Sequence, residues 1–246
     1  QCHEFMELPL RENPPADFPT FNLAKPDSHC PICKHALRIR ENIPVLSYLL
    51  QGGKCTHCSA AISLRYPLVE SVAALLSCVV ALQFGTTWLT LALLFFTWSL
   101  IALTMIDYDH QLLPDDITYP LLWLGLLVNT QGWLTSLDSA VLGAVAGYLI
   151  LWTIYWAFKL LTGKEGMGYG DFKLLAALGA WLGLLALPMI ILLSSLVGAL
   201  TGVSLILFKG KDRNVPIPFG PFLACAGYIA LLWGDQLTTL FFSLTS

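Results

Sequence analysis

The chain has 246 residues, of which 56% are hydrophobic and 12% are charged, and its formal net charge is -3 at pH 7. Soluble domains carry about 25% charged residues, so this composition excludes an ordinary soluble protein and indicates one embedded in a membrane. The weak net charge, with basic residues confined to a few clusters, argues against a nucleic-acid-binding protein.

Residues 1–65 are predicted to form a soluble domain. They hold seven of the thirteen Lys and Arg residues, and they contain no apolar run long enough to cross a bilayer core of about 30 Å. Because Gln1 is not an initiator methionine, we expect the natural chain to begin earlier.

Two Cys-x-x-Cys pairs lie in this domain, Cys30 with Cys33 and Cys55 with Cys58. Each pair supplies one edge of a tetrahedral metal site, and the connection between the pairs is only slightly longer than usual. Four thiolates leave no open coordination position, so we predict structural zinc. The alternative is a pair of redox dithiols. The metal site implies a reducing, cytosolic compartment.

Seven apolar segments follow Arg65 and make up a predicted membrane domain, residues 66–246. They cover residues 66–84, 87–106, 117–133, 139–161, 172–185, 187–208 and 216–234. With the first domain in the cytoplasm, seven crossings place every Lys and Arg on the cytoplasmic side, as the positive-inside rule requires. We therefore predict an α-helical, multi-pass membrane protein with about seven transmembrane helices and a periplasmic carboxyl terminus.

Five aspartates lie at predicted segment ends. Asp107, Asp109, Asp115 and Asp116 surround the end of the second segment and the start of the third, and no Lys or Arg lies among them; Asp171 directly precedes the fifth. By the count of crossings, Asp107 and Asp171 share the cytoplasmic face. Acids at a membrane edge are costly unless they are paired or functional.

Two carboxylates at close range, one protonated and one ionised, activate water in aspartic proteases without a metal. We therefore predict that Asp107 and Asp171 are catalytic. The other three aspartates are interpreted as a solvated loop and a helix cap. The glycines of the turn Gly166–Gly170 are expected to adopt backbone conformations closed to other residues and to give an extended substrate room to approach.

Three features together resemble the bacterial type IV prepilin leader peptidases, which belong to the GxGD class of intramembrane aspartic proteases. They are the run Asp107–Trp123, the turn Gly168–Asp171, and the two cysteine pairs on either side of Asn42–Ser47. The resemblance implies that the protein removes the basic leader from prepilins or pseudopilins of type IV pili or type II secretion. Cleavage would occur at the cytoplasmic face of the bacterial inner membrane.

The resemblance also implies specific residues. Asp107 and Asp171 match the catalytic pair, and the four cysteines match a tetracysteine metal site. The family also methylates the new amino terminus with S-adenosylmethionine, and the positions similar to its methyl-transfer residues are Glu41, Asn42, Gly53 and Lys54. The run Pro218–Pro221 resembles a family motif that flanks the cleft. The family carries a further membrane helix before its cytoplasmic domain, and nothing before His3 can be that helix.

Two other functions fit parts of the sequence. A proton-coupled transporter would use Asp107 and Asp171 as a relay, with a zinc-stabilised cytoplasmic cap, but such proteins usually carry acids near the bilayer midplane and show repeat symmetry. A non-catalytic scaffold whose zinc domain binds a partner leaves the acidic cluster unexplained. We therefore favour the peptidase.

Overall fold

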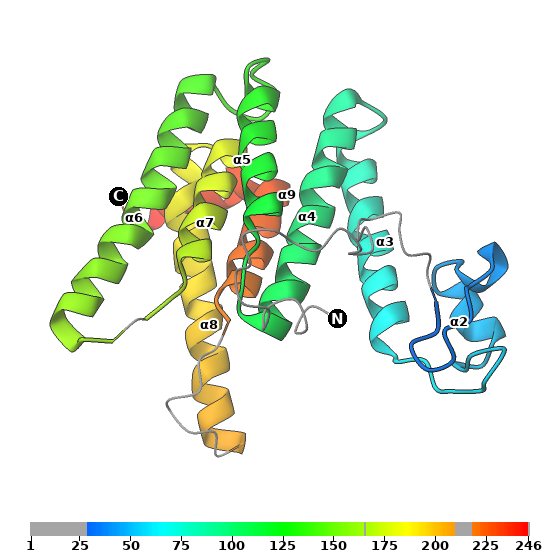
Figure 1. The fold of residues 1–246 in the computed structure, drawn as a ribbon. Helices are drawn as coiled ribbons and strands as arrows, with labels where there is room; N and C mark the ends of the chain where they lie inside the picture. Colours follow the sequence, from blue (N-terminus) through cyan, green and yellow to red (C-terminus); the bar gives the residue numbers. More distant parts are fainter. Residues whose placement is uncertain (1–28, 165, 210–217, 246) are drawn as a thin grey trace, which may run out of the picture. The chain divides into compact units, whose positions relative to one another are not determined.

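The computed structural model describes residues 29–164, 166–209 and 218–245. Within these residues the structure is helical, and its only β features are two isolated bridges. The chain divides into two compact units, Gln1–Val72 and Ala73–Ser246. Figure 1 shows the helices of each unit.

The first unit contains the short helices η1 (Ile39–Glu41) and α2 (Leu46–Leu50) and the start of α3 (Arg65–Phe84). Its two Cys-x-x-Cys pairs lie in turns of the same design. In each turn, the residue after the second cysteine has a left-handed backbone with φ of 57° (Lys34 and Ser59), and an antiparallel bridge closes the turn (His29 with Ala36, and Lys54 with Ala61). The chain therefore builds one metal-binding turn twice.

A helix forms at each of the seven predicted apolar segments. The helices are α3, α4 (Trp88–His110), α5 (Asp115–Asn129), α6 (Leu137–Thr162), α7 (Tyr169–Leu182), α8 (Leu187–Lys209, preceded by η2, Leu184–Ala186) and α9 (Gly220–Thr245).

The predicted number of membrane spans is not confirmed. Among the described residues, four helical stretches are long and apolar enough to cross a membrane: Arg65–Phe84, Trp88–His110, Leu137–Thr162 and Leu184–Leu205. The apolar stretch Gly220–Gly234 is shorter. Helices α5 and α7 have 15 and 14 residues, so each rises only about 22 Å, less than the bilayer core of about 30 Å.

Helix α7 is the centre of the second unit, with both faces buried against neighbouring helices. It packs most closely on α6, where Gly179 faces Gly143: a Cβ atom on Gly179 would overlap the Gly143 carbonyl oxygen. A Cβ on Gly147 would lie 2.7 Å from the Leu175 oxygen. Gly143 and Gly147 therefore serve close helix packing, as their small-residue spacing predicts.

A buried asparagine fixes the far end of α7 to α5. The Asn129 amide nitrogen donates hydrogen bonds to the carbonyl oxygens of Ala180 (2.8 Å) and Trp181 (2.9 Å), and its oxygen accepts from the backbone N–H groups of Leu134 and Thr135. Both the nitrogen and the oxygen of the Asn129 amide are therefore hydrogen-bonded to the backbone. An unpaired polar group at this buried position would be costly. These bonds hold α7 in place and so set the position of Asp171 in its first turn.

Candidate active site and metal centre

Asp107 lies in the last turn of α4, where its side chain is buried and only 5% of the residue is exposed. The helix ends at Gln111, whose left-handed conformation (φ 53°, ψ 41°) turns the chain away. Pro114 then precedes the first turn of α5. The chain therefore reverses immediately after Asp107 and forms a short loop over it.

Asp171 lies in the first turn of α7, with 6% of the residue exposed. Gly168 is the N-cap residue, and its N–H donates a hydrogen bond to Oδ2 of Asp171 at 3.2 Å. An acid three positions after the N-cap commonly closes a helix start in this way. The sequence prediction began this helix at residue 172, three residues late, because it treated the glycines as loop.

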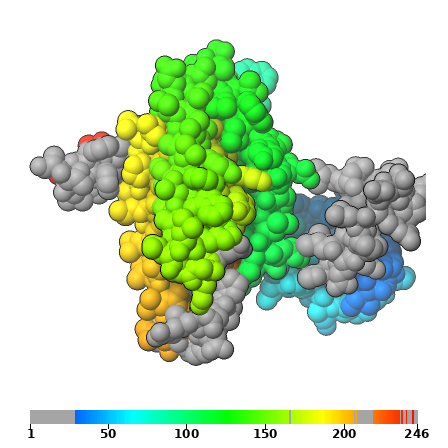
Figure 2. Space-filling view, turned by 60° about the vertical axis from the view of Figure 1, so that its left-hand side comes forward, coloured from blue at the N-terminus to red at the C-terminus, as the bar shows by residue number. Residues whose placement is uncertain are grey.

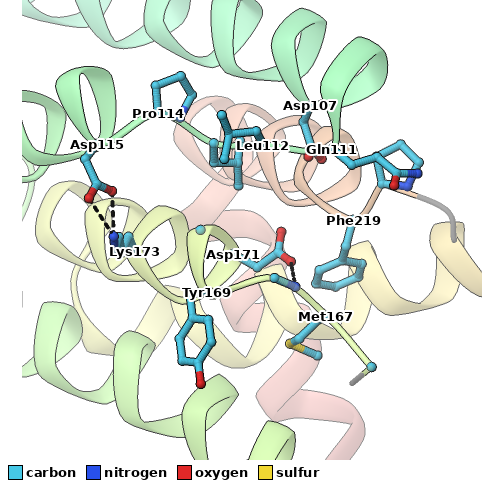
Figure 3. A pocket seen from close by; sticks show the side chains of 15 residues that line it. Asp107, Gln111, Leu112, Pro114, Asp115, Met167, Tyr169, Asp171, Lys173 and Phe219 are labelled. Atoms are coloured by element: carbon cyan, nitrogen blue, oxygen red, sulfur yellow. Dashed lines mark hydrogen bonds and ion pairs between the residues drawn. The ribbon is translucent and has the colours of Figure 1, made fainter. Parts of the chain in front are cut away.

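Asp107 and Asp171 line one pocket of about 670 Å³. Figure 3 shows their carboxyl groups on opposite walls, turned toward the space between them. The remaining walls come from the loop Gln111–Pro114, the turn Gly166–Gly170, and residues Asp115, Lys173, Pro218 and Phe219. The structure thus brings together in one pocket two aspartates that are 64 positions apart in the chain.

Each of the two carboxylates accepts a hydrogen bond from the backbone at the start of a helix. Oδ2 of Asp107 accepts from the N–H of Gly220, 3.0 Å away, and Gly220 is the first residue of α9. Asp171 is held in the same manner at the start of α7. The amino end of a helix carries partial positive charge, so each contact fixes one carboxyl oxygen and helps to stabilise the single negative charge that two carboxyl groups sharing one proton carry.

Gly220 has no room for a side chain. A Cβ atom there would lie 2.6 Å from Oδ2 of Asp107 and 3.2 Å from Leu113. The sequence analysis placed Pro218–Pro221 beside the cleft but missed this contact, because Gly220 is 113 positions from Asp107. Only the resemblance of this run to a family motif marked it as important.

The expectation for the glycines before Asp171 is partly wrong. Gly168 has φ of -82°, which any residue adopts, and neither Gly166 nor Gly170 is left-handed. At Gly170 a Cβ atom would lie 2.7 Å from the Leu113 Cβ. The close approach that glycine permits there is to the protein's own loop, while the space at Gly168 is open apart from the Asp171 carboxylate.

The acidic cluster is less repulsive than its sequence suggests. Asp115 forms an ion pair with Lys173, whose Nζ lies 2.6 and 2.8 Å from its two carboxylate oxygens. Asp115 and Asp116 lie in the first turn of α5, where acids favour a helix start, but neither caps the helix as predicted, because Pro114 occupies the N-cap position. No basic residue lies near the cluster in sequence, because Lys173 comes from α7. The ion pair joins α5 to α7 at the edge of the pocket.

The four sulfur atoms of Cys30, Cys33, Cys55 and Cys58 lie within 4.8 Å of one another. Sγ of Cys30 is 3.8 Å from that of Cys58, and Sγ of Cys33 is 3.9 Å from that of Cys55. A tetrahedral zinc with bonds of about 2.3 Å requires sulfur separations of about 3.8 Å. These distances fit that geometry and are far too long for disulfide bonds of about 2.05 Å.

The turn also prepares its first cysteine for a metal. Hydrogen bonds from the backbone at Cys33 and Ile32 lower the pKa of the Cys30 thiol to about 6, whereas a backbone hydrogen bond at His35 is outweighed by desolvation and the neighbouring thiols, which raise the pKa of Cys33 to about 11. A lower pKa favours the thiolate, the form that binds metal. Among the described residues, the group with metal-binding geometry contains the four cysteines and none of the nearby histidines. His35 and His57 instead stack on each other, with ring centroids 5.1 Å apart.

Glu41 connects the two cysteine turns. Its carboxylate accepts a hydrogen bond from the Thr56 hydroxyl, which lies in the second turn, and lies 3.6 Å from Nε2 of His35, beside the first. It also accepts from the Arg38 N–H at 2.8 Å. The hydrogen bonds from Thr56 and Arg38 lower the pKa of Glu41. The ionised Glu41 carboxylate therefore links the two cysteine turns of the first unit.

The other three positions matched to methyl transfer differ in character. Gly53 is left-handed (φ 70°), and a Cβ there would lie 2.8 Å from the Tyr48 hydroxyl, so its requirement for glycine is structural. Asn42 and Lys54 are exposed. Gln51 and Thr56 flank the Gly53–Lys54 pair, and both hydrogen-bond to Glu41. The structure thus brings the segment of Glu41 and Asn42 beside that of Gly53 and Lys54.

Comparison with known proteins gives matches over most of the chain. The model of the bacterial peptidase A24 N-terminal domain matches residues 8–84, and that of the type IV leader peptidase family matches residues 94–203. No solved structure matches the chain.

Several curated proteins named prepilin leader peptidase/N-methyltransferase are similar over most of their length. The protein of Aeromonas salmonicida (strain A449) is 61% identical over 93% of this chain and 79% of its own. That of Pseudomonas aeruginosa is 61% identical over 89% and 76%, and that of Neisseria gonorrhoeae is 50% identical over 95% and 79%. With two buried aspartates in one pocket and a tetracysteine cluster, this chain belongs to the type IV prepilin leader peptidase family.

Proposed function

We propose that the protein removes the leader peptide from type IV prepilins or pseudopilins with an aspartate dyad and then methylates the new amino terminus. The observation that carries the peptidase function is the placement of Asp107 and Asp171 on opposite walls of one pocket. Because the family consists of leader peptidases, this arrangement supports an aspartic protease in preference to a proton relay. The test is removal of the leader from a purified prepilin, and its loss when either aspartate is replaced.

The proposed mechanism uses one proton shared by the two carboxyl groups. The ionised carboxylate accepts a proton from a water molecule in the pocket as that water attacks the scissile carbonyl carbon. The protonated carboxyl gives its proton to the carbonyl oxygen, which forms a neutral tetrahedral intermediate. The carboxyl that took the proton from water then passes it to the leaving nitrogen as the C–N bond breaks, while the other carboxylate recovers a proton from a hydroxyl of the intermediate, which restores the carbonyl. The N–H groups of Gly168 and Gly220 hold one oxygen of each carboxylate, which leaves the other oxygen of each for water and substrate.

The proposed orientation follows from the basic residues. Residues 1–65 would lie in the cytoplasm as a zinc-binding domain implicated in methyl transfer. Residues 66–246 would form the peptidase domain in the inner membrane, with a periplasmic carboxyl terminus. The short helices α5 and α7 would then lie within the helical bundle without each spanning the bilayer by itself. In this orientation the pocket faces the cytoplasm, where the basic leader of a prepilin would lie.

Zinc at the four cysteines would hold the two turns of the first unit together. Replacing Cys30 with serine is expected to reduce bound zinc to near zero and to expose residues 29–64 to proteolysis, because the metal supplies much of the stability of such a small domain. Metal analysis and limited proteolysis measure both effects. Cys78→Ser, at an exposed position of α3, should keep the metal. A folded, protease-resistant Cys30→Ser protein without zinc would contradict the structural role.

We propose that Asn42 and Lys54 contact the methyl donor, because they are the exposed members of the four matched positions. S-adenosylmethionine supplies the methyl group when bound.

Lys54→Ala is expected to lower methylation at least about tenfold while leader cleavage stays within about twofold of normal. Mass spectrometry of the product separates the two activities. Lys34→Asn removes another exposed lysine with a residue that tolerates its left-handed backbone. Equal methylation by the unsubstituted protein, Lys54→Ala and Lys34→Asn would contradict this assignment.

A further inference from the structure

We propose that a groove between α6 and α8 receives the apolar membrane helix of the substrate, on the mature side of the bond that is cleaved. The groove has a volume of about 350 Å³ and is separate from the space between the aspartates. The proposal rests on the proposed peptidase function and identifies where the substrate enters.

The groove adjoins the catalytic pocket. Met167 and Phe219 line both, and in Figure 3 they lie on the Asp171 side of the pocket. Met167 belongs to the turn that precedes Asp171, and Phe219 directly precedes Gly220, whose N–H holds Asp107. A chain that passes from the groove into the pocket therefore reaches both carboxylates within a few residues.

The walls of the groove are apolar and open to the surface of the molecule. Leu151 and Ile154 of α6 form one wall, and Ile154 is 46% exposed. In Figure 2 the surface of α6 lies in front of the yellow and orange surface of α8. The two helices pack on different partners, α6 chiefly on α7 and α8 chiefly on α9, which leaves space between them.

Three small residues of α8 lie in the other wall, together with Ile191 of α8 and Phe222 of α9. Ser195, Gly198 and Ala199 line the groove, and a Cβ on Gly198 would approach the ring of Phe222 to 3.3 Å. Small side chains let the backbones of two membrane helices approach closely, and they recur at helix–helix contacts in bilayers. This wall therefore has the composition of a surface that another helix covers.

Packed helix pairs border two other sides of the pocket among the described residues. Helix α5 packs on α7, where the Asp115–Lys173 ion pair bridges them at the pocket, and α4 packs on α9. A substrate whose scissile bond precedes an apolar helix must pass from the polar pocket into apolar surroundings. There its backbone needs helical hydrogen bonds, because hydrocarbon supplies no partners. The groove between α6 and α8 provides such an apolar path out of the pocket.

Filling the groove tests the proposal. Ala199→Trp should raise KM about tenfold or more for a prepilin that retains its apolar helix. It should leave cleavage of a short peptide, made of the leader and the first few mature residues, within about twofold of normal. Val197→Trp is the matched control: it adds the same side chain to α8 at an exposed position outside the groove, and both substrates should be cleaved normally.

The outcomes separate the two proposals. Failure of the unsubstituted protein to cleave either substrate would contradict the proposed function. Normal cleavage of both substrates by Ala199→Trp, or equal loss on both, would contradict the groove as the helix site while leaving the peptidase intact.

Crosslinking tests the same contact without depending on activity. A photoreactive amino acid at position 199 of the Asp171→Asn protein, in vesicles with prepilin, should crosslink to the apolar helix of the substrate. The same group at position 197 should not. Equal substrate crosslinking from both positions, or crosslinking from position 199 to phospholipid alone, would overturn the proposal.

Discussion

Replacing Asp107 or Asp171 with asparagine is expected to lower kcat/KM for leader cleavage by about 10³-fold or more. Asparagine has nearly the same shape and keeps an oxygen that can accept the hydrogen bond from Gly220 or Gly168. It cannot ionise or share a proton, so it removes the chemistry while preserving the packing. Both variants should therefore fold and keep their metal. The measurement is the rate of leader removal from a purified prepilin in detergent or vesicles.

Asp116→Asn is the matched control for these two substitutions. Asp116 is exposed in the first turn of α5 and does not line the pocket. Its replacement should change the rate by no more than about twofold. Near-normal cleavage by either Asp107→Asn or Asp171→Asn would refute the dyad. A loss as large in Asp116→Asn would show that the charge of the whole cluster, and not the buried pair, is what cleavage requires.

Gly220→Ala is expected to lower kcat about 30- to 100-fold with little change in KM. The added methyl group would lie 2.6 Å from Oδ2 of Asp107, so either the carboxylate or the start of α9 must move. A small displacement of a reacting group is enough for a loss of this size, because catalysis depends on alignment. Substrate binding changes little because the bulk of the pocket and groove is unaltered. Steady-state kinetics on a prepilin measures kcat and KM separately.

Gly234→Ala tests whether the effect belongs to the position or to the residue type. Gly234 lies on the same helix, and a Cβ there would have no neighbour within 4 Å. Its replacement should leave kcat within about twofold of normal. If Gly220→Ala were equally active, the contact with Asp107 would not position the carboxylate. If it instead raised KM alone, Gly220 would act in substrate binding and not in alignment.

The sequence predicted the helices well because helices of membrane proteins are marked by long apolar runs. Helices formed at all seven predicted places, and the basic residues predicted that Asp107 and Asp171 share a face. The helix ends were less accurate. Helix α5 begins at Asp115, two residues early, because acids stabilise a helix start. Helix α9 continues through Trp233, whose non-helical backbone marks a bend and not an end.

What the sequence did not reveal depends on contacts between distant residues. Lys173 neutralises Asp115 across 58 positions, and Gly220 holds Asp107 across 113. Neither separation leaves a periodic signal. The role of Gly170 was misjudged for a related reason: the neighbour that excludes a side chain is Leu113 of another loop. Helix α5 is also shorter than its predicted segment: its 15 residues rise about 22 Å, less than the bilayer core of about 30 Å.

In the metal domain, too, the local pattern was predictable from the sequence and a contact between distant residues was not. Two Cys-x-x-Cys pairs predicted four clustered thiols from spacing alone, and the structure places their sulfur atoms within 4.8 Å of one another. The connection that Glu41 makes between the two turns has no such signature, since it depends on a glutamate 15 positions from Thr56. Resemblance matched Glu41 to methyl transfer, which stays a prediction, and its hydrogen bonds indicate that it also holds the domain together.

The most direct test of the account is mass spectrometry of a prepilin incubated with the purified protein, with and without S-adenosylmethionine, in parallel with the Asp171→Asn variant. We predict one cleavage at the junction between leader and mature chain, the gain of one methyl group only when the methyl donor is present, and an unchanged prepilin with the variant. Cleavage at that junction by Asp171→Asn at the normal rate, or an intact prepilin with the unsubstituted protein, would contradict the aspartate dyad.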